Sequence, residues 1–177
     1  MKVLIVIDMQ NDFIDGALGT KEAQQIVPAV IDKVNEYQQQ NECVIFTRDT
    51  HHHDYLHTQE GMKLPIEHCI RDTKGWQITD ALTFASSEII DKPSFGTLVL
   101  PKVIENATHG VIESILLVGL CTDICVISNA MILKAAFPEV PIQVDASCCA
   151  GVTRESHQNA LQAMKMCQIT ILNEVKV

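Results

Sequence analysis

Six short apolar runs rich in Val and Ile constrain the fold of this chain more than any other feature. They occupy residues 3–7, 43–46, 89–90, 115–118, 142–144 and 169–172. Such runs are typical of strands buried on both faces of a sheet. Segments of helical length separate many of them, at 22–40, 98–106, 123–136 and 154–166. The alternation predicts an α/β fold, a three-layer α/β/α sandwich with a mostly parallel, doubly wound sheet of about six strands.

Composition limits the remaining choices. With 177 residues, of which 47% are hydrophobic and 20% charged, the chain has the size of one domain, and no linker or repeat divides residues 1–177. The net charge of -9 without a Lys/Arg cluster argues against a nucleic-acid partner. The apolar N-terminal run is too short for a membrane span. Seven scattered cysteines without a secretory signal favour a reducing cytoplasm over a disulfide framework.

Polar side chains follow several of the predicted strands at the points where these strands end. Asp8 follows the first, Asp49 and then His51 the second, Lys92 the third, and the segment 119–125 the fourth. Ligands of open α/β sheets bind at the carboxyl ends of the strands. One rim of the sheet is therefore expected to hold these residues together.

A cysteine nucleophile is one interpretation of this rim. Cys125 is predicted in the first turn of a helix, whose dipole stabilises a thiolate, and Lys92 would add a positive charge. Asp8, desolvated at a strand end, suits a general base, and the backbone N–H groups of Cys121 and Cys125 suit an oxyanion hole. Considered alone, Cys125 is typical of a buried core residue, Asp8 is typical of a residue that caps a loop, and Lys92 is typical of a charged surface residue. Their joint placement favours acyl transfer.

A second group suggests a metal site. Asp49 and His51 have the spacing that puts two side chains on one side of an extended segment, and His68 lies later in the long loop 50–75. Carboxylate and imidazole suit a divalent ion, zinc first, with iron or manganese as alternatives. His57 is either a fourth ligand or a surface histidine, and the pattern favours the surface histidine. The alternative is a solvated, His-rich loop. Phe13 either walls a pocket for a flat substrate or packs the loop onto the core.

The chain resembles the isochorismatase-like cysteine hydrolases, and within them most closely the nicotinamidase/pyrazinamidase branch. The resemblance rests on Asp8-Met-Gln-Asn-Asp-Phe13, Arg48-Asp49-Thr-His51, Glu67-His68-Cys69, Asp91-Lys92-Pro93 and Gly119-Leu-Cys-Thr-Asp-Ile-Cys125-Val126. It implies that Asp8, Lys92 and Cys125 form a catalytic triad, and that Asp49, His51 and His68 bind a divalent metal that holds the ring nitrogen of the substrate. It also implies a cis peptide at Leu120-Cys121 and a homo-oligomer.

The function expected from this resemblance is that of a cysteine-dependent amidohydrolase, which converts nicotinamide to nicotinate and ammonia through a Cys125 thioester. Two departures bear on the substrate. Leu64-Pro65-Ile66-Glu67 precedes His68 where nicotinamidases often carry an aromatic residue, and Cys121 stands where Ala is common. The alternatives are an isochorismatase, an N-carbamoyl hydrolase or a ureido hydrolase, whose known kinds lack the metal set. A thiol- or metal-binding protein without turnover is a further alternative.

Overall fold

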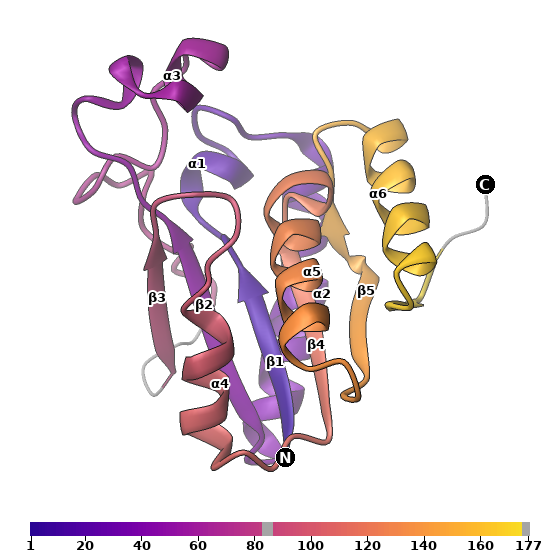
Figure 1. Cartoon of the computed structure of the whole chain (residues 1–177). Coiled ribbons are helices and arrows are strands. Elements are labelled where there is room, and N and C mark those ends of the chain that lie inside the picture. The colour runs from indigo at the N-terminus through magenta and orange to yellow at the C-terminus, as the bar shows by residue number, and fades with distance from the viewer. Residues whose placement is uncertain (83–86, 175–177) are drawn as a thin grey trace.

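A six-stranded, fully parallel sheet forms the centre of the molecule (Figure 1). The computed structural model describes residues 1–82 and 87–174. The strand order is β3-β2-β1-β4-β5-β6. The strands are β1 (Lys2–Ile7), β2 (Cys43–Asp49), β3 (Glu88–Lys92), β4 (Ser114–Leu120), β5 (Ile142–Ala150) and β6 (Thr170–Leu172). The predicted α/β class and the parallel sheet are confirmed.

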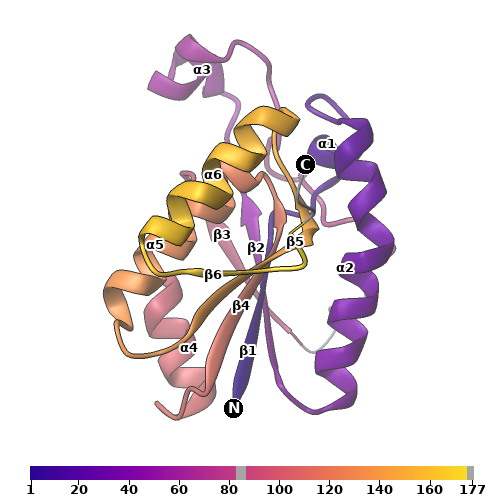
Figure 2. The same ribbon diagram turned by 90° about the vertical axis from the view of Figure 1, so that its right-hand side faces the viewer.

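Helices cover both faces of this sheet, as Figure 2 shows. On one side lies α2 (Lys21–Gln39), and on the other lie α4 (Leu100–Thr108), α5 (Ile127–Ala136) and α6 (Arg154–Met166). Side chains of β1 alternate between the two layers, because strand side chains have a period of two. Leu4 and Val6 belong to the core under α2, whereas Ile5 and Ile7 belong to the core under the other three helices. This is the predicted three-layer sandwich.

Three segments differ from the predicted elements. The helix expected at 123–136 begins with a π-helical turn, η2 (Thr122–Val126), and continues as α5. The long loop 50–75 contains the short helices η1 (Tyr55–His57) and α3 (Gln59–Lys63), which no hydrophobic period had indicated. A further short helix, α1 (Asn11–Ile14), follows β1. Both α1 and α3 lie beyond the carboxyl ends of the strands (Figure 1).

Gly119 allows β4 to approach β1 closely just before the turn that carries Cys125. Its φ is +114°, and a Cβ atom there would lie 2.1 Å from the carbonyl oxygen of Ile7. Only glycine tolerates both conditions.

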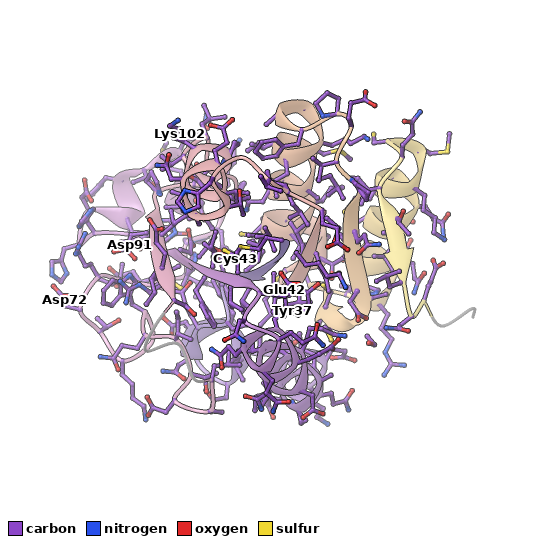
Figure 3. All side chains as sticks on the ribbon, turned by 90° about the horizontal axis from the view of Figure 1, so that it is seen from below. Tyr37, Glu42, Cys43, Asp72, Asp91 and Lys102 are labelled. Carbon is purple, nitrogen blue, oxygen red and sulfur yellow. The ribbon has the colours of Figure 1, made fainter. Side chains whose placement is uncertain are left out.

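The opposite end of the molecule is shown in Figure 3, where Tyr37, Glu42 and Cys43 mark the passage from α2 into β2. The backbone N–H of Glu42 donates to the carbonyl of Tyr37 (3.0 Å), and the Glu42 carboxylate accepts from the backbone N–H of Lys2 (2.6 Å). These bonds close the helix and fix the start of two strands. None of the described helices has the length and apolar character needed to cross a membrane.

Candidate active site

A buried ion pair joins the ends of β1 and β3. The Nζ of Lys92 lies 2.7 Å from Oδ2 of Asp8, and both side chains are fully buried. The hydroxyl of Thr47 donates to the other oxygen of Asp8 (2.7 Å). Lys92 also donates to the carbonyl of Ser94 (3.1 Å). The two residues predicted at separate strand ends are therefore in direct contact.

Cys125 completes this group from the turn η2. Its Sγ lies 3.5 Å from Nζ of Lys92, and the residue is buried. Burial raises the pKa of the Cys125 thiol well above its usual range, and the charge of Asp8 raises it further, while Lys92 acts in the opposite direction. Burial therefore favours the neutral thiol, and a base close to Sγ would be needed to ionise it.

Asp8 has the properties of that base. Burial raises the pKa of its carboxyl above the usual range, although the charge of Lys92 lowers it. Asp8 and Cys125 both contact Nζ of Lys92, at 2.7 and 3.5 Å, so the carboxylate and the thiol lie on either side of one cation. A carboxylate with a raised pKa accepts a proton from a neighbouring thiol more readily than a solvated one does.

The peptide between Leu120 and Cys121 is cis, as the resemblance implied. Cys121 is half-buried and lines the same cavity as Cys125. The carbonyl of Cys121 accepts from the N–H groups of Ile124 (3.1 Å) and Val126 (3.0 Å), which closes the turn that contains Cys125. The role of the Cys121 and Cys125 N–H groups as an oxyanion hole stays a prediction.

Four side chains beside the triad have the composition of a metal site. The ligand atoms of Asp49, His51, Glu60 and His68 all lie within 4.8 Å of one another. Nδ1 of His68 is 2.8 Å from the carbonyl of Ile66, so this nitrogen carries the proton and Nε2 is left as an acceptor. Nε2 of His51 is buried and has no hydrogen-bond partner in the described part of the chain. An unpaired buried nitrogen among two carboxylates and a second imidazole fits a divalent cation.

Glu60 is the member of this group that the sequence analysis missed. It lies on α3, where Thr58 caps the helix by accepting from the N–H of Gly61 (3.0 Å). Its Oε1 is 3.6 Å from Nε2 of His51. His57, the candidate fourth ligand, is instead exposed and outside the group. A Thr cap followed by an acidic residue between two predicted ligands is the signal that would have pointed to Glu60.

Asp49 connects the metal group to the triad. One carboxylate oxygen is 3.3 Å from Nζ of Lys92, and the other is 3.0 Å from Nε2 of His51. Burial opposes its ionisation, but the adjacent His51 ring and the charge of Lys92 hold the pKa of Asp49 below the usual range. The buried amide of Gln10 holds the Asp49 backbone, accepting from its N–H (2.7 Å) and donating to its carbonyl (2.9 Å).

A cavity of about 450 Å³ opens onto both groups. Cys121, Cys125, Asp49, His51, Glu60 and His68 line it together with the apolar residues Phe13, Leu18, Leu64, Phe95 and Ile124. The ring of Phe13 is 5.6 Å from that of His68, at an interplanar angle of 59°. Phe13 is buried and also belongs to the core cluster. Phe13 therefore lines the cavity and packs in the core, and its contact with a flat substrate stays a prediction.

Known proteins resemble this chain in sequence and in fold. The isochorismatase domain model matches residues 2–174. The chain belongs to the isochorismatase family. Among curated relatives of this isochorismatase-family chain, the nicotinamidase of Saccharomyces cerevisiae is 30% identical over 109 residues, which cover 46% of this chain and 50% of that protein. The nicotinamidase of Schizosaccharomyces pombe is 24% identical over 210 residues, with 97% and 92% of the two chains covered.

The fold of this isochorismatase-family chain also matches a solved structure. The pyrazinamidase of Pyrococcus horikoshii, in complex with zinc, aligns with a TM-score of 0.85 and 24% identity. The alignment covers 98% of this chain and 99% of that one.

Proposed function

We propose that this chain is a cysteine-dependent amidohydrolase that releases ammonia from a small aromatic carboxamide, with nicotinamide as the first substrate to test. The observation that carries the proposal is the contact of Asp8, Lys92 and Cys125 beneath a cavity that the Asp49, His51, Glu60 and His68 side chains also line. The nicotinamidases among its relatives support amide hydrolysis.

The triad supplies the covalent chemistry. Asp8 takes the proton of the Cys125 thiol, and Sγ attacks the amide carbonyl carbon to form a C–S bond. The N–H groups of Cys121 and Cys125 stabilise the oxyanion. Asp8 then gives the proton to the amide nitrogen, the C–N bond breaks, and ammonia leaves a thioester on Cys125. Asp8 next removes a proton from water, and the water oxygen attacks the thioester carbon. The C–S bond then breaks, Asp8 returns the proton to Sγ, and the product leaves as a carboxylic acid that ionises in solution.

Lys92 lowers the electrostatic cost of these proton transfers. Its ammonium lies 2.7 Å from Asp8 and 3.5 Å from Cys125. When the proton moves from Cys125 to Asp8, negative charge shifts between two groups that the same cation contacts. The negative charge therefore stays beside the Lys92 ammonium throughout the transfer, which lowers the cost of forming the Cys125 thiolate.

The metal group would position the substrate. Asp49, His51, Glu60 and His68 would hold a divalent cation, with zinc as our first candidate, and this ion would supply a Lewis acid that binds a ring nitrogen. Phe13 would contact the face of a flat ring, since its own ring lies beside that of His68.

The cavity lining favours a neutral substrate over a multiply charged acid. Its described lining residues include one Lys, Lys63, and no Arg. Carboxylates are usually bound by paired cationic or N–H donors. An isochorismate, N-carbamoyl acid or ureido acid is therefore the second candidate substrate class. Cytoplasmic location and self-association stay predictions.

An ammonia-release screen tests the proposal. Purified protein would be assayed with nicotinamide, pyrazinamide, N-carbamoyl and ureido compounds, and bound metal measured in the same samples. We expect release from the two aromatic amides, a loss of at least about a thousandfold in Cys125→Ala, and a mass increase on Cys125 in trapped acyl-enzyme. Cys167→Ala, which removes an exposed thiol, is the matched control. Release that survives in Cys125→Ala would overturn the assignment of the nucleophile.

A further inference from the structure

The turn that carries Cys125 is fastened to a neighbouring helix through its two polar side chains. Thr122 is fully buried, and its Oγ1 lies 2.8 Å from Nδ1 of His157 on α6. Asp123 accepts from the backbone N–H of Val152, just before α6, with its two carboxylate oxygens at 3.1 and 3.3 Å. Both sets of hydrogen bonds join η2 to the first turn of α6 or to the residue just before it. The conformation of η2 therefore depends on where α6 begins.

The start of α6 is itself well defined. Thr153 caps the helix by accepting from the N–H of Ser156 (3.0 Å), and the Ser156 hydroxyl accepts from the N–H of Thr153 (3.0 Å). Gly151 lets the helix approach, because a Cβ atom at this position would lie 2.9 Å from Cβ of His157. A reciprocally capped helix end fixes the first turn on which His157 lies.

The His157 ring is placed to accept a hydrogen bond from the Thr122 hydroxyl. Burial lowers the pKa of His157, although Asp123 on the turn and Glu174 near the C-terminus act in the opposite direction. Glu22 of α2 and Arg154 of α6 line the same cavity as His157, a space of about 370 Å³ behind the turn, and pair with each other at 3.2 Å. The neutral ring has one nitrogen without a proton, and the 2.8 Å contact suits Nδ1 in that role.

We propose that His157 is a positioning residue, which holds the turn carrying Cys125 in its reactive conformation through the hydrogen bond with Thr122. The role rests on the proposed amidohydrolase function. His157 lines the cavity behind the turn, whereas Cys125 lines the cavity in front of it. The hydrogen bond of His157 to the turn is made with Thr122. Because a misplacement of about 1 Å in a reactive group costs about a hundredfold in rate, a bond at the base of this turn affects turnover more than binding.

Kinetics of matched variants test this role. We expect His157→Leu and Thr122→Val to lower kcat by about tenfold or more while KM stays within about twofold. His157→Asn offers a polar atom near the position of Nδ1, and we expect it to recover most of kcat. Gln158→Leu, a substitution at the next residue in the same cavity, is the control and should match the parent chain.

The pH profile separates positioning from a general loss of packing. In the parent chain, protonation of Nδ1 reverses the direction of the hydrogen bond with Thr122 and places a positive charge behind the turn, so kcat should change as pH falls through the pKa of His157. The Asn side chain does not titrate, so this change should be absent from the pH profile of His157→Asn. Melting temperatures and bound metal, measured for every variant, confirm that the compared proteins are folded.

The alkylation rate of Cys125 by iodoacetamide, followed by mass spectrometry, reports on the turn without any substrate. We expect it to fall in parallel with kcat in His157→Leu and Thr122→Val. If no amide is hydrolysed, the proposed function fails, but the alkylation rates still decide the positioning role. Leu and Val variants that keep both kcat and the alkylation rate within about twofold of the parent overturn the inference. So does an Asn variant that is as impaired as the Leu variant.

Discussion

Replacing Lys92 by Met should destabilise the fold in a way that grows with pH. Lys92 lies 2.7 Å from Asp8 and 3.3 Å from Asp49. At an effective dielectric constant of about 20, these distances correspond to attractions of roughly 6 and roughly 5 kcal/mol. The cost of desolvating the ammonium offsets much of this sum. Removing one partner of a buried pair typically costs about 3–5 kcal/mol, because a charge is left uncompensated, and we expect a loss in that range near pH 8.

The pH dependence follows from Asp8. Its pKa in the folded chain is already raised by burial, and Lys92 is the group that opposes this rise. Without Lys92 the folded pKa rises further above the unfolded value of about 3.9. A carboxyl with a raised folded pKa contributes stability while it is protonated, and this contribution is lost as pH rises through the folded pKa. The penalty of Lys92→Met should therefore be smaller near pH 5.5 than near pH 8.

Urea denaturation of chelator-treated protein at the two pH values measures this difference. The double variant Asp8→Asn/Lys92→Met removes both charges of the 2.7 Å pair, so it should recover part of the stability lost near pH 8. Equal penalties at the two pH values, or a penalty below about 1 kcal/mol, would refute the account of Lys92 as the cation that keeps Asp8 ionised.

Two further substitutions test the metal group and the approach of β4 to β1. Glu60→Gln should weaken zinc binding by at least about tenfold, as measured by competition with a chromophoric chelator. His57→Ala, at an exposed position, should leave zinc binding unchanged. Equal losses of zinc affinity in the two variants would contradict the ligand assignment. Gly119→Ala should cost more than about 3 kcal/mol, since its Cβ would lie 2.1 Å from a backbone oxygen. Gly110→Ala, at φ +74° with open space around the new Cβ, should cost only about 1–2 kcal/mol in the same thermal denaturation.

The sheet and the triad were predictable because they follow from period and polarity. Continuous apolar runs indicate parallel strands, and parallel strands bring their carboxyl ends to one edge. Asp8 and Lys92 were each found as the polar residue after such a run, and the structure places them 2.7 Å apart. Predicting that Asp8 and Lys92 lie close together required no information about the loops.

Features that depend on the path of a loop or on burial were not predictable in the same way. Glu60 joins the metal group only because five residues of the long loop form α3. The raised pKa of the Cys125 thiol depends on burial, which the sequence alone does not give. His157 lies 35 residues from Thr122, and no local pattern connects them.

The carboxylate of Asp49 lies between Lys92 and His51, so occupation of the metal site should change the reactivity of Cys125. The negative charge of Asp49 raises the pKa of the Cys125 thiol. A cation bound to this carboxylate would neutralise part of that charge and favour the thiolate. We therefore expect Cys125 to be alkylated faster in zinc-loaded protein than after chelation, when the rate is followed by mass spectrometry with a small neutral reagent. In Asp49→Asn the dependence on zinc should disappear. A rate that zinc leaves unchanged in the parent chain, with zinc binding verified on the same sample, would show that the two halves of the site are not coupled through Asp49.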